Sequence, residues 1–203
     1  MTHDGLLIPR NAHEFAECWA DVTAVLDLTS RLPELPFRAG GGEIRVAQFE
    51  HLLGTDFVPV LEELSDDHGD ATFTVVVIEP EPSYYVEQYS HFPAVRLERT
   101  ALAARYWEGI AHEPAGDPTG AIAYTADVVA MVGAARRWAV WGQRDWDLVM
   151  VHSSASVGSW EHASVPFVSA EEAIRDFTFA WKRDIPLAQP AALLRNLRAY
   201  GAA

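Results

Sequence analysis

The chain has 203 residues and a formal net charge of −14 at pH 7, from 29 acidic and 15 basic residues. Its apolar content of 49% indicates a globular fold, and its length suits one domain over residues 1–203. The strong negative charge argues against a nonspecific nucleic-acid binder and against a protein that docks on anionic membranes.

The N-terminal sequence and the rarity of cysteine and lysine predict where the protein is located. The N-terminus lacks a basic stretch followed by a long apolar run, and no window of about 18 residues is apolar enough to predict a membrane span. Cys18 is the only cysteine and cannot form an internal disulfide. Lys182 is the only lysine, which with abundant Ala and Arg indicates a GC-rich bacterial genome. We therefore expect a bacterial cytoplasmic protein.

The first elements in chain order are helical. Asn11 followed by Glu14 is a capping-box pattern and predicts a helix over 12–30. A loop over 33–42 contains three consecutive glycines. Residues 44–53 fit a helix or a strand, and we favour a helix.

The middle of the chain predicts a helix and then a pair of strands. Thr55 begins an amphipathic helical segment that ends in a run of acidic residues. Residues 71–78 are mostly β-branched and predict a strand with both faces covered. The tyrosine-rich residues 84–89 predict the returning strand, and 97–111 predict a helix.

The second half predicts one further helix and a hairpin. Residues 121–137 are small and suggest a helix, whereas the apolar residues 138–151 predict two strands joined near Gln143. A two-residue loop there places Trp141 opposite Trp146.

The last elements are two helices. Ser169 and Glu172 form a second capping box before a helix over 170–183, and Pro190 opens a helix that ends near Gly201. The whole pattern, strands in two hairpins among several helices, predicts an α+β fold with a mostly antiparallel sheet.

The acidic residues are concentrated in one part of the chain. Residues 1–80 carry a net charge of −11, and the 50 residues between Arg45 and Arg96 contain ten acids and no Lys or Arg. Such a stretch would steer a basic partner by long-range attraction. The residues predicted to bind this partner are Glu62, Glu63, Asp66, Asp67, Asp70 and Glu81.

This profile matches, as a class, small acidic proteins that neutralise basic nucleases or other toxins. The favoured hypothesis is therefore an inhibitor or immunity-type protein that sequesters a basic protein.

The alternative hypothesis is an enzyme or a ligand-binding protein of bacterial metabolism. His152 at a strand end could act as a base if Glu79, at the end of another strand, oriented it. Aromatic side chains could line the pocket for a small molecule. The candidates for this lining are Trp138, Trp141, Trp146, Tyr84 and Tyr85.

Short catalytic and cofactor motifs are absent. The sequence contains no G-x-S-x-G elbow, phosphate-binding G-x-x-x-x-G-K or H-E-x-x-H motif. The acidic run at 66–70 lacks the closing glutamate of an EF-hand loop. We therefore predict no cofactor and no metal site.

Overall fold

The computed structural model describes residues 5–38, 41–155, 164–176, 185–186 and 188–201. Within them the strands are β1 (Leu6–Leu7), β2 (Glu43–Gln48), β3 (Thr72–Glu79), β4 (Ala94–Glu98), β5 (Val128–Gly133), β6 (Trp138–Gln143) and β7 (Leu148–Ser153). The α-helices are α1 (Ala12–Thr23), α2 (Phe49–Leu52), α3 (Val58–His68), α4 (Pro82–Tyr89), α5 (Leu102–Ile110), α6 (Ile122–Thr125), α7 (Ala170–Asp176) and α8 (Ala188–Gly201).

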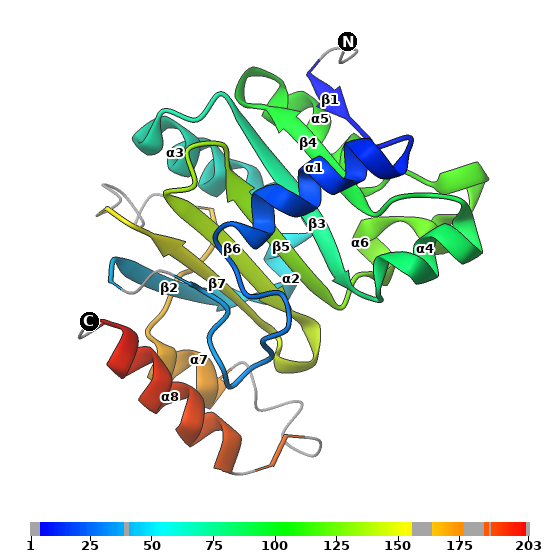
Figure 1. The fold of residues 1–203 in the computed structure, drawn as a ribbon. Helices are drawn as coiled ribbons and strands as arrows, with labels where there is room; N and C mark the ends of the chain where they lie inside the picture. The colour runs from blue at the N-terminus through cyan, green and yellow to red at the C-terminus, as the bar shows by residue number, and fades with distance from the viewer. Residues whose placement is uncertain (1–4, 39–40, 156–163, 177–184, 187, 202–203) are drawn as a thin grey trace.

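The described strands form one sheet in the order β1-β4-β3-β5-β6-β7-β2 (Figure 1). Every neighbouring pair is antiparallel, and the two predicted hairpin regions share this sheet. The structure thereby confirms the α+β class with an antiparallel sheet packed by helices.

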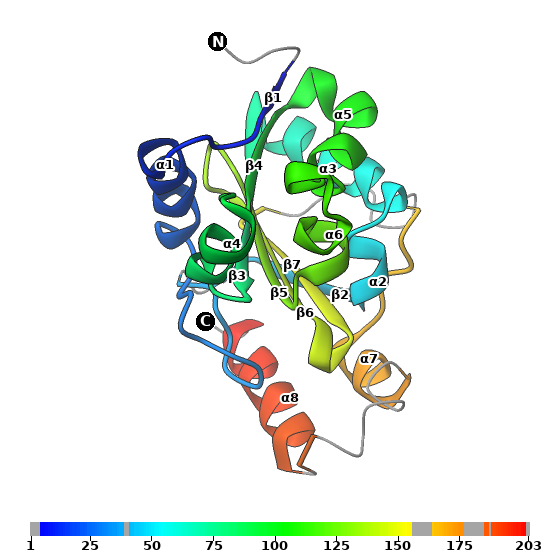
Figure 2. The same cartoon turned by 90° about the vertical axis from the view of Figure 1, so that its right-hand side faces the viewer.

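Helices cover both faces of the sheet, with α1 on one side and α2, α3, α5 and α6 on the other (Figure 2). The β3 side chains alternate between these two layers, as the period of a strand requires. The layer with α3 receives Phe73, Val75 and Val77, and the layer with α1 receives Val76 and Ile78. Burial on both faces explains why β3 reads as a continuous apolar run.

The predicted helix over 44–53 is wrong in its first half. Glu43–Gln48 form β2, which pairs with β7, and only Phe49–Leu52 are helical. An apolar run this short is compatible with either structure, so pairing with β7 decides it.

The predicted strand over 84–89 is also wrong, because these residues belong to α4. Pro82 lies in its first turn, where its fixed φ and missing N–H suit a helix. Tyr85 is fully buried and Tyr89 packs against the same core, so the inward side chains recur every four residues. The strand that returns beside β3 is β4.

Residues 121–137 form a short helix, α6, and then β5, not one long helix. Val129 and Met131 pack in one core layer, whereas Val128 and Val132 pack in the other. This alternation belongs to a central strand that is buried on both faces.

The predicted hairpin over 138–151 is confirmed, but its turn is longer than two residues. Trp141 pairs with Met150, and Trp146 lies in the 3₁₀ turn Arg144–Trp146. Asp147 closes this turn with a φ of 51°.

The two helix starts predicted from side-chain caps, at Asn11 and Ser169, are confirmed. The Asn11 side chain accepts hydrogen bonds from the backbone N–H groups of His13 and Glu14 at 3.0 Å. Ser169 and Glu172 bond reciprocally, as in a capping box. Helix α1 ends at Thr23, earlier than predicted, and residues 177–183 of the predicted helix over 170–183 lie outside the described residues.

Candidate functional site

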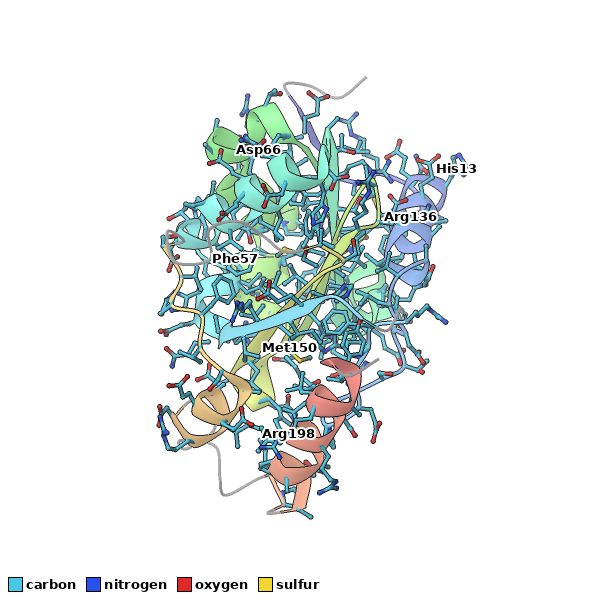
Figure 3. All side chains as sticks on the ribbon, turned by 90° about the vertical axis from the view of Figure 1, so that its left-hand side faces the viewer. His13, Phe57, Asp66, Arg136, Met150 and Arg198 are labelled. Atoms are coloured by element: carbon cyan, nitrogen blue, oxygen red, sulfur yellow. The ribbon has the colours of Figure 1, made fainter. Side chains whose placement is uncertain are left out.

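Four of the predicted partner-binding carboxylates lie on α3, and Arg99 covers part of this group. The Arg99 guanidinium donates two hydrogen bonds to Asp66 at 2.8 and 2.7 Å and one to Glu62 at 3.3 Å. The hydrogen bond from Arg99 holds the pKa of Asp66 below its ordinary value. Glu62, Glu63, Asp66 and Asp67 together are called the α3 group. Figure 3 shows Asp66 on α3, on the side of the sheet opposite to α1 and Arg136.

Asp70, the fifth predicted residue, is buried and does not belong to the surface. One carboxylate oxygen accepts from Trp138 Nε1 at 2.7 Å, and the other accepts from the Ala135 backbone N–H at 2.5 Å. A Cβ built at Gly133 would lie 2.2 Å from Asp70 Oδ2, so this glycine leaves room for the carboxylate. Asp70 therefore holds the turn between β5 and β6.

Glu81, the sixth predicted residue, lies next to α4 and away from the α3 group. Helix α3 ends shortly before β3 begins, and α4 begins shortly after β3 ends. The eight residues of β3 span about 25 Å at the usual strand rise. The acidic stretch is therefore continuous in sequence but forms two separate groups in the folded protein.

The second group forms a surface that is both acidic and apolar. Tyr84 and Val86 of α4 are 40% and 39% exposed, among the most exposed large apolar side chains of the described residues. The hydrogen bond with Tyr89 raises the pKa of Tyr84, and the nearby negative charge of Asp117 adds to this rise. We call Glu81, Tyr84, Val86, Glu87 and Asp117 the α4 surface.

Folding brings two base-free segments together at this surface. Residues 46–95 and 106–135 both lack Lys and Arg. Helix α4 comes from the first segment, and Tyr89 Oη lies 3.1 Å from Thr119 Oγ1 of the second. Within the described part of the chain, Glu81 and Glu87 form no ion pair.

The catalytic pair proposed from the sequence is not assembled. His152 lies on β7 opposite Ala139 of β6, whereas Glu79 lies on β3 opposite Val128 of β5. Strands β5 and β6 separate β3 from β7, and the two residues lie near opposite ends of the sheet. Glu79 instead pairs with Arg31 at 2.6 Å.

His152 is enclosed and has no carboxylate beside it among the described contacts. Its Nε2 bonds to the Gly41 carbonyl oxygen at 3.0 Å, and its ring lies between Phe37 and Tyr200. Burial lowers its pKa, so the imidazole is neutral at pH 7.

A serine–histidine pair that sequence reasoning missed lies on the other face of β7. His68 Nε2 lies 2.8 Å from Ser153 Oγ, and this hydroxyl donates to the Ala155 carbonyl oxygen at 2.6 Å. Ser153 is fully buried, so the pair joins α3 to β7 in the interior of the protein. Its partners are 85 positions apart, so no local motif marks it.

The predicted aromatic set does not line one pocket. Trp138 and Tyr85 are buried in the layer with α3, whereas Trp141 and Trp146 are buried in the layer with α1. Tyr84 is exposed on α4. The three tryptophans fill the core instead.

A large cleft lies elsewhere and has a different lining. It has a volume of about 800 Å³ and lies between α1, residues 28–31 and the start of α4. Phe15 and Trp19 supply its aromatic walls, and Arg31 and Glu81 are its charged members. We call it the α1–α4 cleft.

A second, more polar cleft of about 570 Å³ contains two histidines. The rings of His91 and His112 are 5.4 Å apart. Burial, assisted by His112, lowers the pKa of His91 to about 4. Across the described residues, no three His, Cys, Asp or Glu side chains are arranged to hold a metal ion.

Comparisons with known proteins provide no family for this chain. No family model matches it, and neither a curated protein nor a solved structure is significantly similar to it. Among the described helices, none combines the length and the apolar character needed to cross a membrane.

Proposed function

We propose that this protein binds a basic partner protein through the α4 surface and neutralises it by covering its functional face. The observation that carries this proposal is the exposure of Tyr84 and Val86 beside Glu81 and Glu87, which form no ion pair among the described residues. A surface of this kind offers both apolar contact and unneutralised negative charge.

The two components of the α4 surface have different physical roles. Tyrosine is enriched at protein interfaces because its ring buries apolar area and its hydroxyl can keep a polar partner. Carboxylates attract a basic partner from a distance and raise the association rate more than the final affinity. An inhibitor of a basic protein needs both properties, since it must find its target quickly and dissociate slowly.

The α3 group supports the proposal only indirectly. Arg99 forms ion pairs with Asp66 and Glu62, so the charges of these two carboxylates are partly neutralised. Glu62, Glu63, Asp66 and Asp67 add to the negative field around the molecule, but apolar contact is available on α4. We therefore place the interface on α4 and treat the α3 group as a source of attraction.

Affinity capture with matched variants tests the proposal. The baits are the unmodified protein, the double variant Glu81→Lys/Glu87→Lys and the control Glu63→Lys/Asp67→Lys. The two variants carry the same change of net charge, one on each acidic group. Captured proteins are identified from lysate of the encoding organism, and the dissociation constant is then measured with the purified partner.

The proposal predicts a basic protein that is retained by the unmodified and α3-variant baits. The α4 variant should weaken its binding by about 100-fold, since two close charge pairs are replaced by repulsions. Loss with the α3 variant alone, equal loss with both variants, or capture of no basic protein by the unmodified bait would each contradict the proposal.

A further inference from the structure

The α1–α4 cleft has the size and the lining of a small-molecule site. Its volume of about 800 Å³ lies within the range of ligand pockets, and most of its lining is apolar. Leu28 and Ile78 are buried and form its base, whereas Phe15 and Trp19 lie on its α1 side. None of these four residues belongs to the α4 surface.

The aromatic wall of the cleft is held in place by its own packing. The Phe15 ring lies 5.7 Å from the Trp19 ring and 5.3 Å from the Phe92 ring, with which it stacks. Phe15 is therefore fixed between two rings, and Trp19 remains half-buried with part of its surface toward the cleft. A wall fixed in this way loses little conformational freedom when a ligand binds.

The charged groups of the cleft discriminate against an anionic ligand. Arg31 donates to Glu79 through Nε at 2.7 Å and contacts it through Nη2 at 2.6 Å. Its Nη1 donates to the carbonyl oxygens of Leu28 and Ser30 at 2.8 and 2.6 Å. Most donors of the guanidinium are thus engaged, and Glu79 neutralises its charge.

Glu81 supplies the remaining charge at the mouth of the cleft. It is exposed, lines the cleft and forms no ion pair among the residues that the structure describes. An ammonium group bound beside Glu81 would gain an opposite charge, and the Trp19 and Phe15 side chains offer apolar contact to the rest of the ligand. A carboxylate in this position would instead meet Glu81.

We infer that the α1–α4 cleft binds a small organic cation with a flat apolar body, of the chemical class of arylalkylamines. The amine lies at Glu81 and the apolar body lies against Trp19 and Phe15. The cleft shares Glu81 with the α4 surface, but the inference does not depend on a basic partner protein, because the aromatic wall that holds the apolar body lies on α1.

Calorimetric titration with three probes that share one ring system tests this inference. Tryptamine carries an ammonium group, tryptophol is its neutral analogue and indole-3-acetate carries a carboxylate. The protein variants are Glu81→Gln, Trp19→Leu and the control Glu87→Gln. Ala20→Leu adds a fourth variant, since Ala20 is exposed on α1 and a larger side chain there narrows the mouth without disturbing the core.

We expect tryptamine to bind about tenfold more tightly than tryptophol, and indole-3-acetate to bind most weakly. Glu81→Gln should reduce tryptamine affinity by about tenfold and leave tryptophol affinity unchanged. Trp19→Leu and Ala20→Leu should weaken both probes, whereas Glu87→Gln should change neither. Thermal melting of each variant verifies that it is folded.

Three outcomes would overturn the inference. They are no binding of tryptamine to the unmodified protein, equal affinity for tryptamine and indole-3-acetate, and unchanged tryptamine affinity in a folded Ala20→Leu variant. Because these titrations contain no protein partner, they can fail while partner binding through α4 succeeds, and the reverse also holds.

Discussion

The α3 group and the α4 surface come from the same base-free stretch of sequence, yet folding treats them differently. On α3, Arg99 reaches across from the segment after β4 and pairs with Asp66 and Glu62. On α4, the neighbouring segment is itself free of Lys and Arg, so Glu81 and Glu87 acquire no cation among the described residues. A high density of acidic residues along the sequence therefore does not by itself produce a high density of negative charge on the surface.

Asp70 differs from both groups, because it lies just after α3 in the sequence but is buried. Its two oxygens satisfy Trp138 Nε1 and the Ala135 N–H inside the protein. A buried carboxylate with two donors supports the fold, whereas an exposed one without a cation is available to a partner. Mutations can test this division into structural and available carboxylates.

The largest effect is expected for Asp70→Ala. The change leaves the indole N–H of Trp138 and the backbone N–H of Ala135 without acceptors and opens a small cavity. We expect the free energy of unfolding to fall by about 3 kcal/mol, measured by urea denaturation. The control Glu87→Gln should change stability by less than about 0.5 kcal/mol. A loss below about 1 kcal/mol for Asp70→Ala would show that this carboxylate is not structural.

A pH dependence of similar size is expected from His91, which follows α4. Its backbone N–H donates to the Tyr85 carbonyl oxygen at 3.4 Å. Its pKa of about 4 in the folded protein lies below the ordinary value of 6.5. Between these values the unfolded chain binds more protons at this site than the folded protein. Stability is therefore full above about pH 6.5 and is lost progressively toward pH 4, by about 3 kcal/mol in total.

His91→Gln checks the assignment of this pH dependence. The variant should flatten the curve of unfolding free energy against pH between pH 6.5 and pH 4. The charged or titratable groups that share the cleft with His91 are Arg10, Glu14, Glu108 and His112. A curve that keeps its slope in a folded His91→Gln variant would show that this pH dependence does not arise from His91.

A somewhat smaller effect is expected for Tyr84→Ala, which tests the apolar part of the α4 surface. Truncation of a central interface tyrosine typically costs about 2 kcal/mol, or about 30-fold in affinity. We expect this loss in the dissociation rate of the captured partner, measured by surface plasmon resonance. Trp107, which is 44% exposed on α5, provides the matched control because it lies outside the α4 surface. An equal loss for Trp107→Ala would place the interface elsewhere.

The smallest effect is expected for Arg99→Gln on α3. Exposed ion pairs contribute little, so the free energy of unfolding should fall by about 0.5–1 kcal/mol at low salt and less at high salt. The pKa of Asp66 should rise toward its ordinary value, because the Arg99 hydrogen bond holds it down. Titration followed by NMR measures this rise. Its absence would indicate that Arg99 does not neutralise the α3 group.

Arg99→Gln also tests the comparison between the two groups directly. The variant removes the cation that pairs with the α3 carboxylates, so that the α3 group, like the α4 surface, lacks this ion pair. If the partner binds α4, removal of Arg99 should raise the association rate slightly through the stronger negative field and leave the dissociation rate unchanged.

Several elements could be predicted from the sequence because their signals are local. Asn11 and Ser169 cap their helices through side chains within three residues. The hairpin of β6 and β7 follows from two long apolar runs joined by a short turn. The class of the fold then follows from the order of such elements, since consecutive antiparallel strands pair readily.

Other elements were decided only by tertiary contacts. The α4 sequence is compatible with a strand until Pro82 and the inward-facing Tyr85 and Tyr89 are placed against the core. The β5 sequence is compatible with a helix until both of its faces are covered. Short apolar runs satisfy either period, and burial selects between them.

The candidate site divides in the same way. The acidity of this protein, its aromatic richness and the long stretch without bases follow from the sequence alone, because they are properties of composition. Tertiary contacts bury Asp70, pair Arg99 with two carboxylates of α3 and bring α4 beside a second base-free segment. They also pair Glu79 with Arg31 and not with His152. Each of these outcomes depends on residues that are distant along the chain, and strand register and helix packing alone determine which of them meet.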